Sequence, residues 1–310
     1  MRELSPGKKH LPSELALAAF IVVVIAVASI IQPRFLSLNN IKSILLYLPL
    51  LITVSMGMMM VIISRNFDMS VGSIMGCSGL AVGFIIAANP GFPLLPAFAL
   101  SAAIGAALGF INGFAVTNLK LHSIIVTLST LNIYRGITYV FSKRRMVSAW
   151  ELPEALHNLT RTKSPVPAVV IIAVVIAVIV ALFLRYTHVG REIFIVGSNP
   201  QAAMLRGVNV KMITWLVFIL SGALAGFSGM IYASRFGMLN PNQTGVGFEF
   251  EVLAATIIGG ISVNGGSGTV LGAVLGCVLL GSVKTALSVS GVAGTLQELS
   301  YGIIIVAALV

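Results

Sequence analysis

The sequence predicts an all-α integral membrane protein with about ten transmembrane helices, some of them interrupted or half-length. The 310-residue chain is 57% hydrophobic and only 9% charged. Soluble domains carry about 25% charged residues, so this chain cannot cover a globule with a solvated surface. Its apolar residues gather into ten runs, most of them near the length that crosses a bilayer as a helix. We therefore expect a single polytopic transmembrane domain over residues 1–310.

The expected spans follow one another along the whole chain. They cover residues 15–31, 44–63, 71–88, 94–116, 124–141, 166–184, 212–233, 252–261, 270–287 and a tail beginning near Leu299. The run 252–261 is short for a full crossing and is predicted to be a half-helix or half of a bent helix. The tail stops at Val310, about 12 residues into a span. A helix that ends inside the bilayer leaves carbonyls unpaired, so we expect the natural chain to continue or to end just past the membrane.

The segment 190–207 between two apolar spans has the signals of one small helix that is too polar to cross a membrane. Asn199 is a good N-cap, because its side chain can accept a hydrogen bond from a backbone N–H of the first turn. Pro200 suits the first helical position, and Gly207 supplies a left-handed stop. Such a helix is expected to contact another molecule. The alternative is an ordinary interfacial amphipathic turn.

The charges and the scattered histidines indicate no enzyme. The net charge of +10 is interpreted as contact with lipid headgroups rather than with nucleic acid. Lys and Arg divide evenly between alternate loops, so the positive-inside rule gives no orientation. The sequence contains no P-loop motif, its four His have no metal-ligand spacing, and Cys77 and Cys277 are interpreted as small buried hydrophobes. We expect no cofactor, no metal and no catalytic residue in this chain.

Polar residues inside apolar spans indicate either a solute pathway or interhelical hydrogen bonds. Thr127, Thr130 and Tyr134 form one polar stripe on the fifth span, for which the two interpretations are weighed evenly. Polar breaks at 65–68 and 264–268 resemble the paired interruptions of transporter helices. Asp68 is the only acidic residue near a span that is not clearly at its end, which argues against a proton-driven pump. The candidate pathway residues are Asp68, Ser70, Asn112, Thr127, Thr130, Asn132 and Asn264.

Glycines recur at four-residue spacing in several spans and predict close helix packing. A weak internal echo, in which Gly-x3-Gly-Cys occurs twice, suggests an internal repeat, and chance in Gly-rich helices is the alternative. These glycines are Gly105, Gly109 and Gly113, Gly222 and Gly226, and the echoed pairs Gly72 and Gly76, Gly272 and Gly276.

Five segments in order resemble the permease subunit of a bacterial ABC importer of the ribose/autoinducer-2 (simple sugar) type. They are residues 64–73, 109–113, 125–136, 190–207 and 259–268, so the resemblance runs through nearly the whole chain. It implies a multi-pass inner-membrane protein that imports a monosaccharide or autoinducer-2 between two permease subunits, identical or sister. It further implies that a separate cytoplasmic subunit binds and hydrolyses ATP, and that a periplasmic solute-binding protein delivers the solute.

The resemblance also assigns an ATPase-coupling site. Such permeases carry a Glu-Ala-Ala-x3-Gly pattern in the cytoplasmic coupling helix, and this chain departs from it only at the first position, Gln201. The implied coupling residues are Asn199, Gln201, Ala202, Ala203, Arg206 and Gly207, in a cytoplasmic loop of about 185–211. The basic loop of about 142–165 would then be periplasmic. The segment 240–247 is similar to one in autoinducer-2 permeases and slightly favours autoinducer-2 as the substrate. A passive facilitator or channel and a non-conducting scaffold subunit stay open as alternatives.

Overall fold

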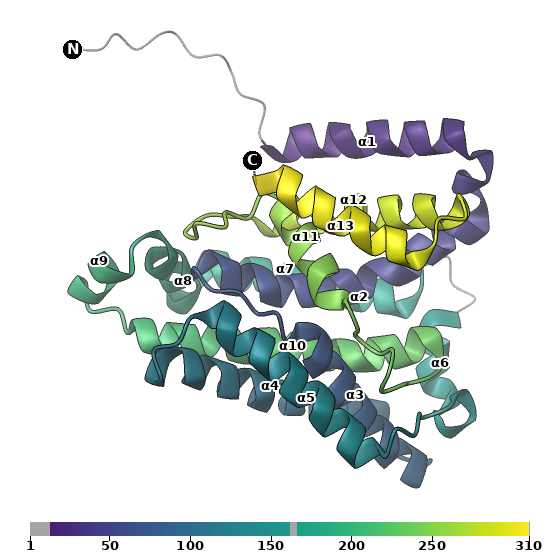
Figure 1. Ribbon diagram of the computed structural model, residues 1–310, viewed down its shortest axis with the longest axis horizontal. Helices are drawn as coiled ribbons and strands as arrows, with labels where there is room; N and C mark the ends of the chain where they lie inside the picture. Colours follow the sequence, from purple (N-terminus) through teal and green to yellow (C-terminus); the bar gives the residue numbers. More distant parts are fainter. Residues whose placement is uncertain (1–12, 162–165, 310) are drawn as a thin grey trace.

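The structure is a computed structural model that describes residues 13–161 and 166–309. Its long helices run along one axis of the molecule and form a single bundle (Figure 1). The helices are α1 (Ser13–Ile31), α2 (Leu38–Ile63), α3 (Val71–Ala88), α4 (Leu94–Asn118), α5 (Ser123–Ser142), α6 (Glu154–Arg161), α7 (Ala168–Tyr186), α8 (His188–Ser198), α9 (Pro200–Leu205), α10 (Val210–Phe236), α11 (Phe248–Ile258), α12 (Val270–Val289) and α13 (Gly294–Leu309). Two 3-10 helices, η1 (Pro33–Leu36) and η2 (Ala149–Glu151), lie in the connections.

The number of spans agrees with the sequence prediction. Eight of the described helices are long and apolar enough to cross a membrane, namely α1 to α5, α7, α10 and α12. The shorter α11 and α13 are two further apolar helices of the bundle, so an all-α fold with about ten membrane helices, some of them short, is confirmed. The short α6 lies at one end of the bundle, and α8 and α9 lie at the other (Figure 1).

Some predicted boundaries are wrong where polar residues occupy the first turns of a helix. α2 begins at Leu38 rather than at residue 44, and α13 begins at Gly294 rather than near 299. The segment 190–207 contains two helices instead of one, because α8 already occupies its first half. Thr187 caps α8 by accepting a hydrogen bond of 2.9 Å from the N–H of Gly190. The polar residues of the first turn belong to each helix. A prediction that counts only apolar residues leaves them out and places the start of the helix too late.

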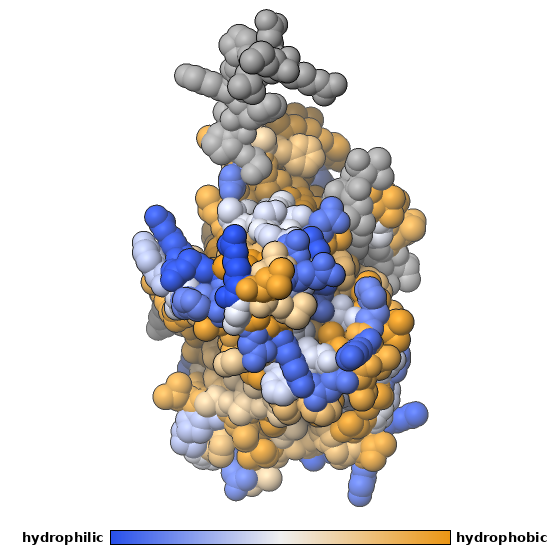
Figure 2. Space-filling model, turned by 90° about the vertical axis from the view of Figure 1, so that its left-hand side faces the viewer, coloured by the Kyte–Doolittle hydropathy of each residue, from blue (hydrophilic) through white to orange (hydrophobic). Residues whose placement is uncertain are grey.

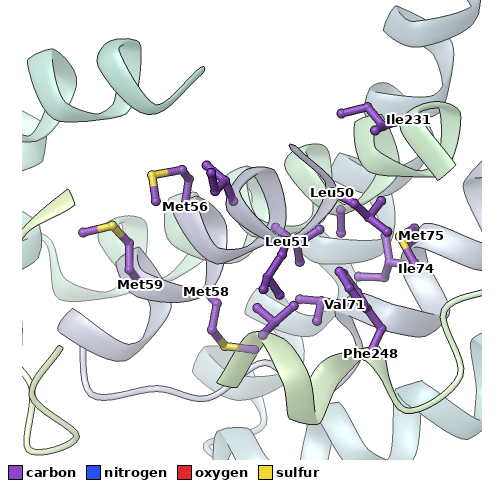
Figure 3. Packing of buried hydrophobic residues seen from close by; sticks show 14 of the residues in the cluster. Leu50, Leu51, Met56, Met58, Met59, Val71, Ile74, Met75, Ile231 and Phe248 are labelled. Atoms are coloured by element: carbon purple, nitrogen blue, oxygen red, sulfur yellow. The ribbon is translucent and has the colours of Figure 1, made fainter. Parts of the chain in front are cut away.

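Helix α2 is the centre of the core. Of its most apolar stretch, 89% is buried, against 6% for α1. Figure 3 shows Leu50 and Leu51 of α2 next to Ile74 and Met75 of α3, with Phe248 of α11 close by. A helix segment that is apolar on nearly every side is typical of complete burial, and α2 is surrounded in this way from Leu50 to Ile63.

Helices α4 and α10 approach closely through the predicted glycine faces. A Cβ atom added to Gly105 would lie 2.1 Å from the carbonyl oxygen of Gly222, and one added to Gly109 would lie 2.1 Å from that of Phe218. The Ser101 hydroxyl donates a hydrogen bond of 2.6 Å to the carbonyl of Gly226 across the same contact. The prediction of close packing is therefore confirmed for this helix pair.

The connection between α2 and α3 carries the chain from the bundle end into its interior. Arg65 at its start is exposed, whereas Asp68 is fully buried. Asp68 contacts Ser221, which lies in the middle of α10. The polar break predicted at 65–68 therefore reaches into the helix bundle.

A second connection, residues 237–247, enters the bundle from the opposite end. Leu239 packs on Gly83 of α3, and Gly245 packs against Gly72 near the start of α3. α11 then begins beside the first turn of α3, which places Phe248 close to Val71 (Figure 3). This segment consists of turns over residues 241–247 followed by the short α11, so the predicted half-helix at 252–261 is confirmed, with the bounds of α11.

Candidate functional site

Helices α8 and α9 form a protrusion at one end of the bundle (Figure 1). Asn199 caps α9, since its Oδ1 accepts a hydrogen bond of 3.0 Å from the N–H of Ala202. Pro200 is the first helical residue, and Gly207 has a φ of +81°, a left-handed conformation that favours glycine. The capped helix predicted from these three residues is confirmed.

The outer face of α9 is apolar at its tip. Leu205 is 91% exposed and Met204 is 57% exposed. Viewed end-on, apolar atoms at this end are surrounded by hydrophilic ones (Figure 2). Gln201, Ala202 and Arg206 are exposed as well, whereas Ala203 is fully buried against its own chain. Of the two alanines assigned to coupling, only Ala202 is thus available on the outer surface.

The base of the protrusion is tied to the bundle by Arg65. Its Nε donates to the carbonyl of Asn264 at 2.8 Å, and its Nη2 donates to the carbonyl of Ser198 at 2.9 Å. A Cβ atom on Gly197 would lie 1.7 Å from the carbonyl oxygen of Ile63, so α8 can approach α2 only because this residue is glycine. The candidate pathway residue Asn264 is exposed and belongs to this base rather than to the bundle interior.

A buried polar network joins the α2–α3 connection, α4, α5 and α10 inside the bundle. The Oδ1 atom of Asp68 accepts hydrogen bonds from the backbone N–H and the hydroxyl of Ser70, at 3.1 and 2.6 Å. Its Oδ2 atom accepts from the Ser221 hydroxyl at 2.9 Å. Asn112 donates to the Ser70 hydroxyl at 2.7 Å, and the Tyr134 hydroxyl lies 2.9 Å from the Asn112 Oδ1. These donors stabilise a carboxyl that would be costly to bury alone.

The two sides of α5 carry polar residues with different surroundings. Thr127 and Thr130 are buried, and Thr127 donates to carbonyls of Phe67 and Ser123 at 3.2 and 2.9 Å. The stripe that these threonines form with Tyr134 therefore packs against other parts of this chain and is not exposed on the surface of the bundle. Asn132 lies on another side of α5 and is exposed.

Two residues that are not among the candidate pathway residues, Arg135 and Ser221, hold parts of the interior together. Arg135 of α5 donates to the carbonyls of Thr244 and Gly245, both at 3.1 Å, and so fixes the connection 237–247. As a cation inside an apolar span, Arg135 is among the intramembrane polar residues that the sequence singles out. Ser221, the partner of Asp68, carries no such signal in a span rich in small residues.

The described residues show no grouping that would hold a metal. Within 13–161 and 166–309, no three His, Cys, Asp or Glu side chains come together. Cys77 and Cys277 are free and buried, and the Cys277 thiol lies 3.3 Å from the Ser55 hydroxyl. Both behave as the small buried hydrophobes that the sequence predicts.

The chain forms a bundle of about ten membrane helices. Two of its connections enter the interior, and a capped helix projects at one end. This architecture is typical of the membrane subunit of a transporter. One solved structure shares this fold over 95% of this chain and 98% of its own, with a TM-score of 0.50 at 15% identity. It is described as an inward-facing conformation of an ABC transporter of metal-chelate type.

The family described as "Branched-chain amino acid transport system / permease component" matches residues 40–309. The chain belongs to this family and is a multi-pass permease subunit of the bacterial inner membrane. Among its relatives are autoinducer 2 import system permease proteins LsrC. The protein of Yersinia enterocolitica serotype O:8 is 33% identical over 94% of this chain and 79% of its own length. Those of Enterobacter sp. strain 638 and Escherichia coli strain K12 / DH10B are 34% and 32% identical, over 97% and 96% of this chain and 86% of each relative.

Proposed function

We propose that this permease imports autoinducer-2 or a monosaccharide, driven by ATP that a separate cytoplasmic subunit binds and hydrolyses. The similarity to autoinducer 2 import permeases supports this solute. The observation that carries the proposal is α9, a capped helix that presents Leu205 and Met204 at its tip. Apolar side chains this exposed on a water-facing helix gain stability when a partner covers them, and the ATPase subunit is that partner. Gln201, Ala202 and Arg206 complete the docking surface.

Movement of the ATPase subunit reaches the bundle through the base of the protrusion. Asn199 and Gly207 hold the ends of α9, and the buried Ala203 fixes it against its own chain. Arg65 links Ser198, directly before Asn199, to the end of α2 and to Asn264. Helix α9 therefore moves as a rigid element. Its displacement shifts the equilibrium of the bundle between inward- and outward-facing states.

The solute passes between this chain and a second permease subunit, identical or sister. Ser129 and Asn132 are exposed polar residues on α5. Polar groups are costly against lipid, so this side of α5 faces the partner and the pathway. The buried residues Asp68, Ser70, Asn112, Thr127 and Thr130 hold the elements behind it in position.

The loop of about 142–165 receives the periplasmic solute-binding protein. Residues 162–165, including Lys163, lie outside the described part of the chain. In η2 of this loop, Trp150 is 83% exposed. Tryptophan is enriched among the residues that dominate binding energy at protein interfaces. An exposed Trp beside the basic residues 143–145 supports this docking surface.

Substitution of Leu205 tests the proposal. We expect Leu205→Gln to lower ATP-dependent uptake of autoinducer-2 and ribose into proteoliposomes by at least about tenfold. It should also reduce co-purification of the ATPase subunit. The reason is that an anchor residue contributes about 2 kcal/mol to the binding free energy of an interface. Leu95→Gln is the matched control, because Leu95 is 82% exposed at the opposite end.

Three outcomes would contradict the proposal. Unchanged ATP-dependent uptake by Leu205→Gln excludes α9 as the docking helix. ATP-independent uptake by the unmodified chain alone supports a passive facilitator. A wild-type assembly that binds the ATPase subunit and takes up neither solute supports a scaffold subunit.

A further inference from the structure

A polar cavity lies at the end of the bundle opposite α9, between α2, α10, α12 and α13. Its volume is about 270 Å³. It opens to the surface beside exposed residues such as Ser43 and Ser288. The polar side chains that matter for its chemistry are Asn40, Ser43, Tyr47, Arg235, Lys284 and Gln297.

Two cations flank one aromatic ring in this cavity. The Lys284 Nζ atom lies 4.4 Å from the centre of the Tyr47 ring, and the Arg235 guanidinium lies 5.0 Å from it. Glu251 pairs with Lys284 at 2.6 Å. Arg235 has no ion pair among the described residues, and its buried Nη1 atom has no hydrogen-bond partner there. The two cations and one paired carboxylate leave the group with a net charge of about +1.

Hydrogen-bond donors in the cavity remain available. Lys284 donates to Glu251 and to the Tyr47 hydroxyl, at 2.6 and 3.1 Å. An ammonium has three N–H groups, so one remains. The Tyr47 hydroxyl accepts from Lys284 and can donate its own proton. Together with the Arg235 guanidinium, these groups supply donors to several oxygen atoms of one anion.

We propose that this cavity binds a phosphate group, either as the free ion or as the headgroup of an anionic phospholipid. Guanidinium and ammonium groups that converge with a hydroxyl form strong charge-assisted bonds to phosphate oxygens. Binding joins α2, α10 and α12 at this end, and the site is independent of the docking of α9.

Phosphate titration of the purified full-length protein in detergent tests the free ion, with chloride at equal ionic strength as the reference. We expect phosphate to raise the melting temperature by about 3 °C. Arg235→Gln should require at least about tenfold more phosphate, as expected for one lost bond to a charged group. Arg34→Gln removes the same charge from exposed η1 at the same end and should respond like wild type.

A second variant keeps the test valid if Arg235→Gln does not fold. Tyr47→Phe removes the hydroxyl donor and keeps the ring, so it should also weaken the phosphate response. Nanodiscs of phosphatidylglycerol, compared with phosphatidylcholine, test the headgroup. Stabilisation by phosphatidylglycerol alone, lost in Arg235→Gln or Tyr47→Phe, assigns the site to lipid. Equal responses of wild type and both variants to phosphate and to phosphatidylglycerol overturn the proposal.

Discussion

Arg65 connects three segments that are far apart in the sequence, although its side chain is exposed. Its φ of +65° lies in the left-handed region, where glycine would be less strained. Glycine would, however, remove both hydrogen bonds, to Asn264 and to Ser198. The two hydrogen bonds of the side chain therefore explain why arginine rather than glycine occupies this position. They link the docking helix α9 to the bundle.

Arg65→Gln should uncouple transport from ATP turnover. Loss of the two hydrogen bonds loosens the base of α9, so we expect the number of solutes moved per ATP to fall about tenfold, within the range of coupling energies between sites. Uptake and ATP hydrolysis measured together in proteoliposomes give this ratio. Arg185→Gln, an exposed cation at the same end, should leave it unchanged. Equal losses of uptake and hydrolysis in Arg65→Gln would show a merely structural role.

At the scale of elements, α4 and α10 depend on close backbone contact. Gly109→Ala should lower the free energy of unfolding by about 1–3 kcal/mol, because its Cβ atom would overlap the carbonyl of Phe218. Gly302→Ala on α13 is the matched control, since nothing lies within 4 Å of its Cβ position. Alanine should stabilise that helix by about 1 kcal/mol. Denaturant unfolding in detergent measures both, and an equal effect of the two substitutions would refute the close-contact argument.

Local signals predicted α9 well and α8 poorly, for a physical reason. Asn199, Pro200 and Gly207 act within one short helix, so the sequence alone specifies their roles. Gly197 resembles a helix breaker, yet it lies inside α8 because α2 passes against it. The role of Gly197 depends on a contact with a segment far away in the sequence, so the neighbouring residues in the chain do not reveal it. In the same way, the Thr127–Thr130 stripe predicted a polar side of α5 without predicting what covers it.

At the scale of the whole molecule, the exposed side of α5 is the candidate contact with the second permease subunit. A photocrosslinking amino acid placed at Asn132 should capture a permease chain, of the same or a sister sequence, in native membranes. The same group at Ile171, which is 55% exposed on α7, should capture mainly lipid. Mass spectrometry identifies the adducts. Lipid adducts alone at both positions would place the pathway elsewhere.

The number and order of spans could be predicted because each follows from a long apolar run. The assembly of the interior could not. Asp68 and Ser221, or Arg135 and Gly245, are more than a hundred residues apart, and only the folded chain brings each pair together. Of the candidate pathway residues, Asp68, Ser70 and Asn112 meet in one buried group, whereas Asn132 and Asn264 lie elsewhere.

The central place of α2 has a consequence for biogenesis. This helix leaves the ribosome early, whereas α10 and α12, which surround it in the finished bundle, are synthesised much later. During that interval α2 must reside in lipid or in the insertion machinery. Between Tyr47 and Ile63 its largely apolar surface suits both the temporary lipid environment and the final protein interior. A charged residue introduced into the buried part of α2, between Tyr47 and Ile63, would therefore impair insertion before it could affect transport.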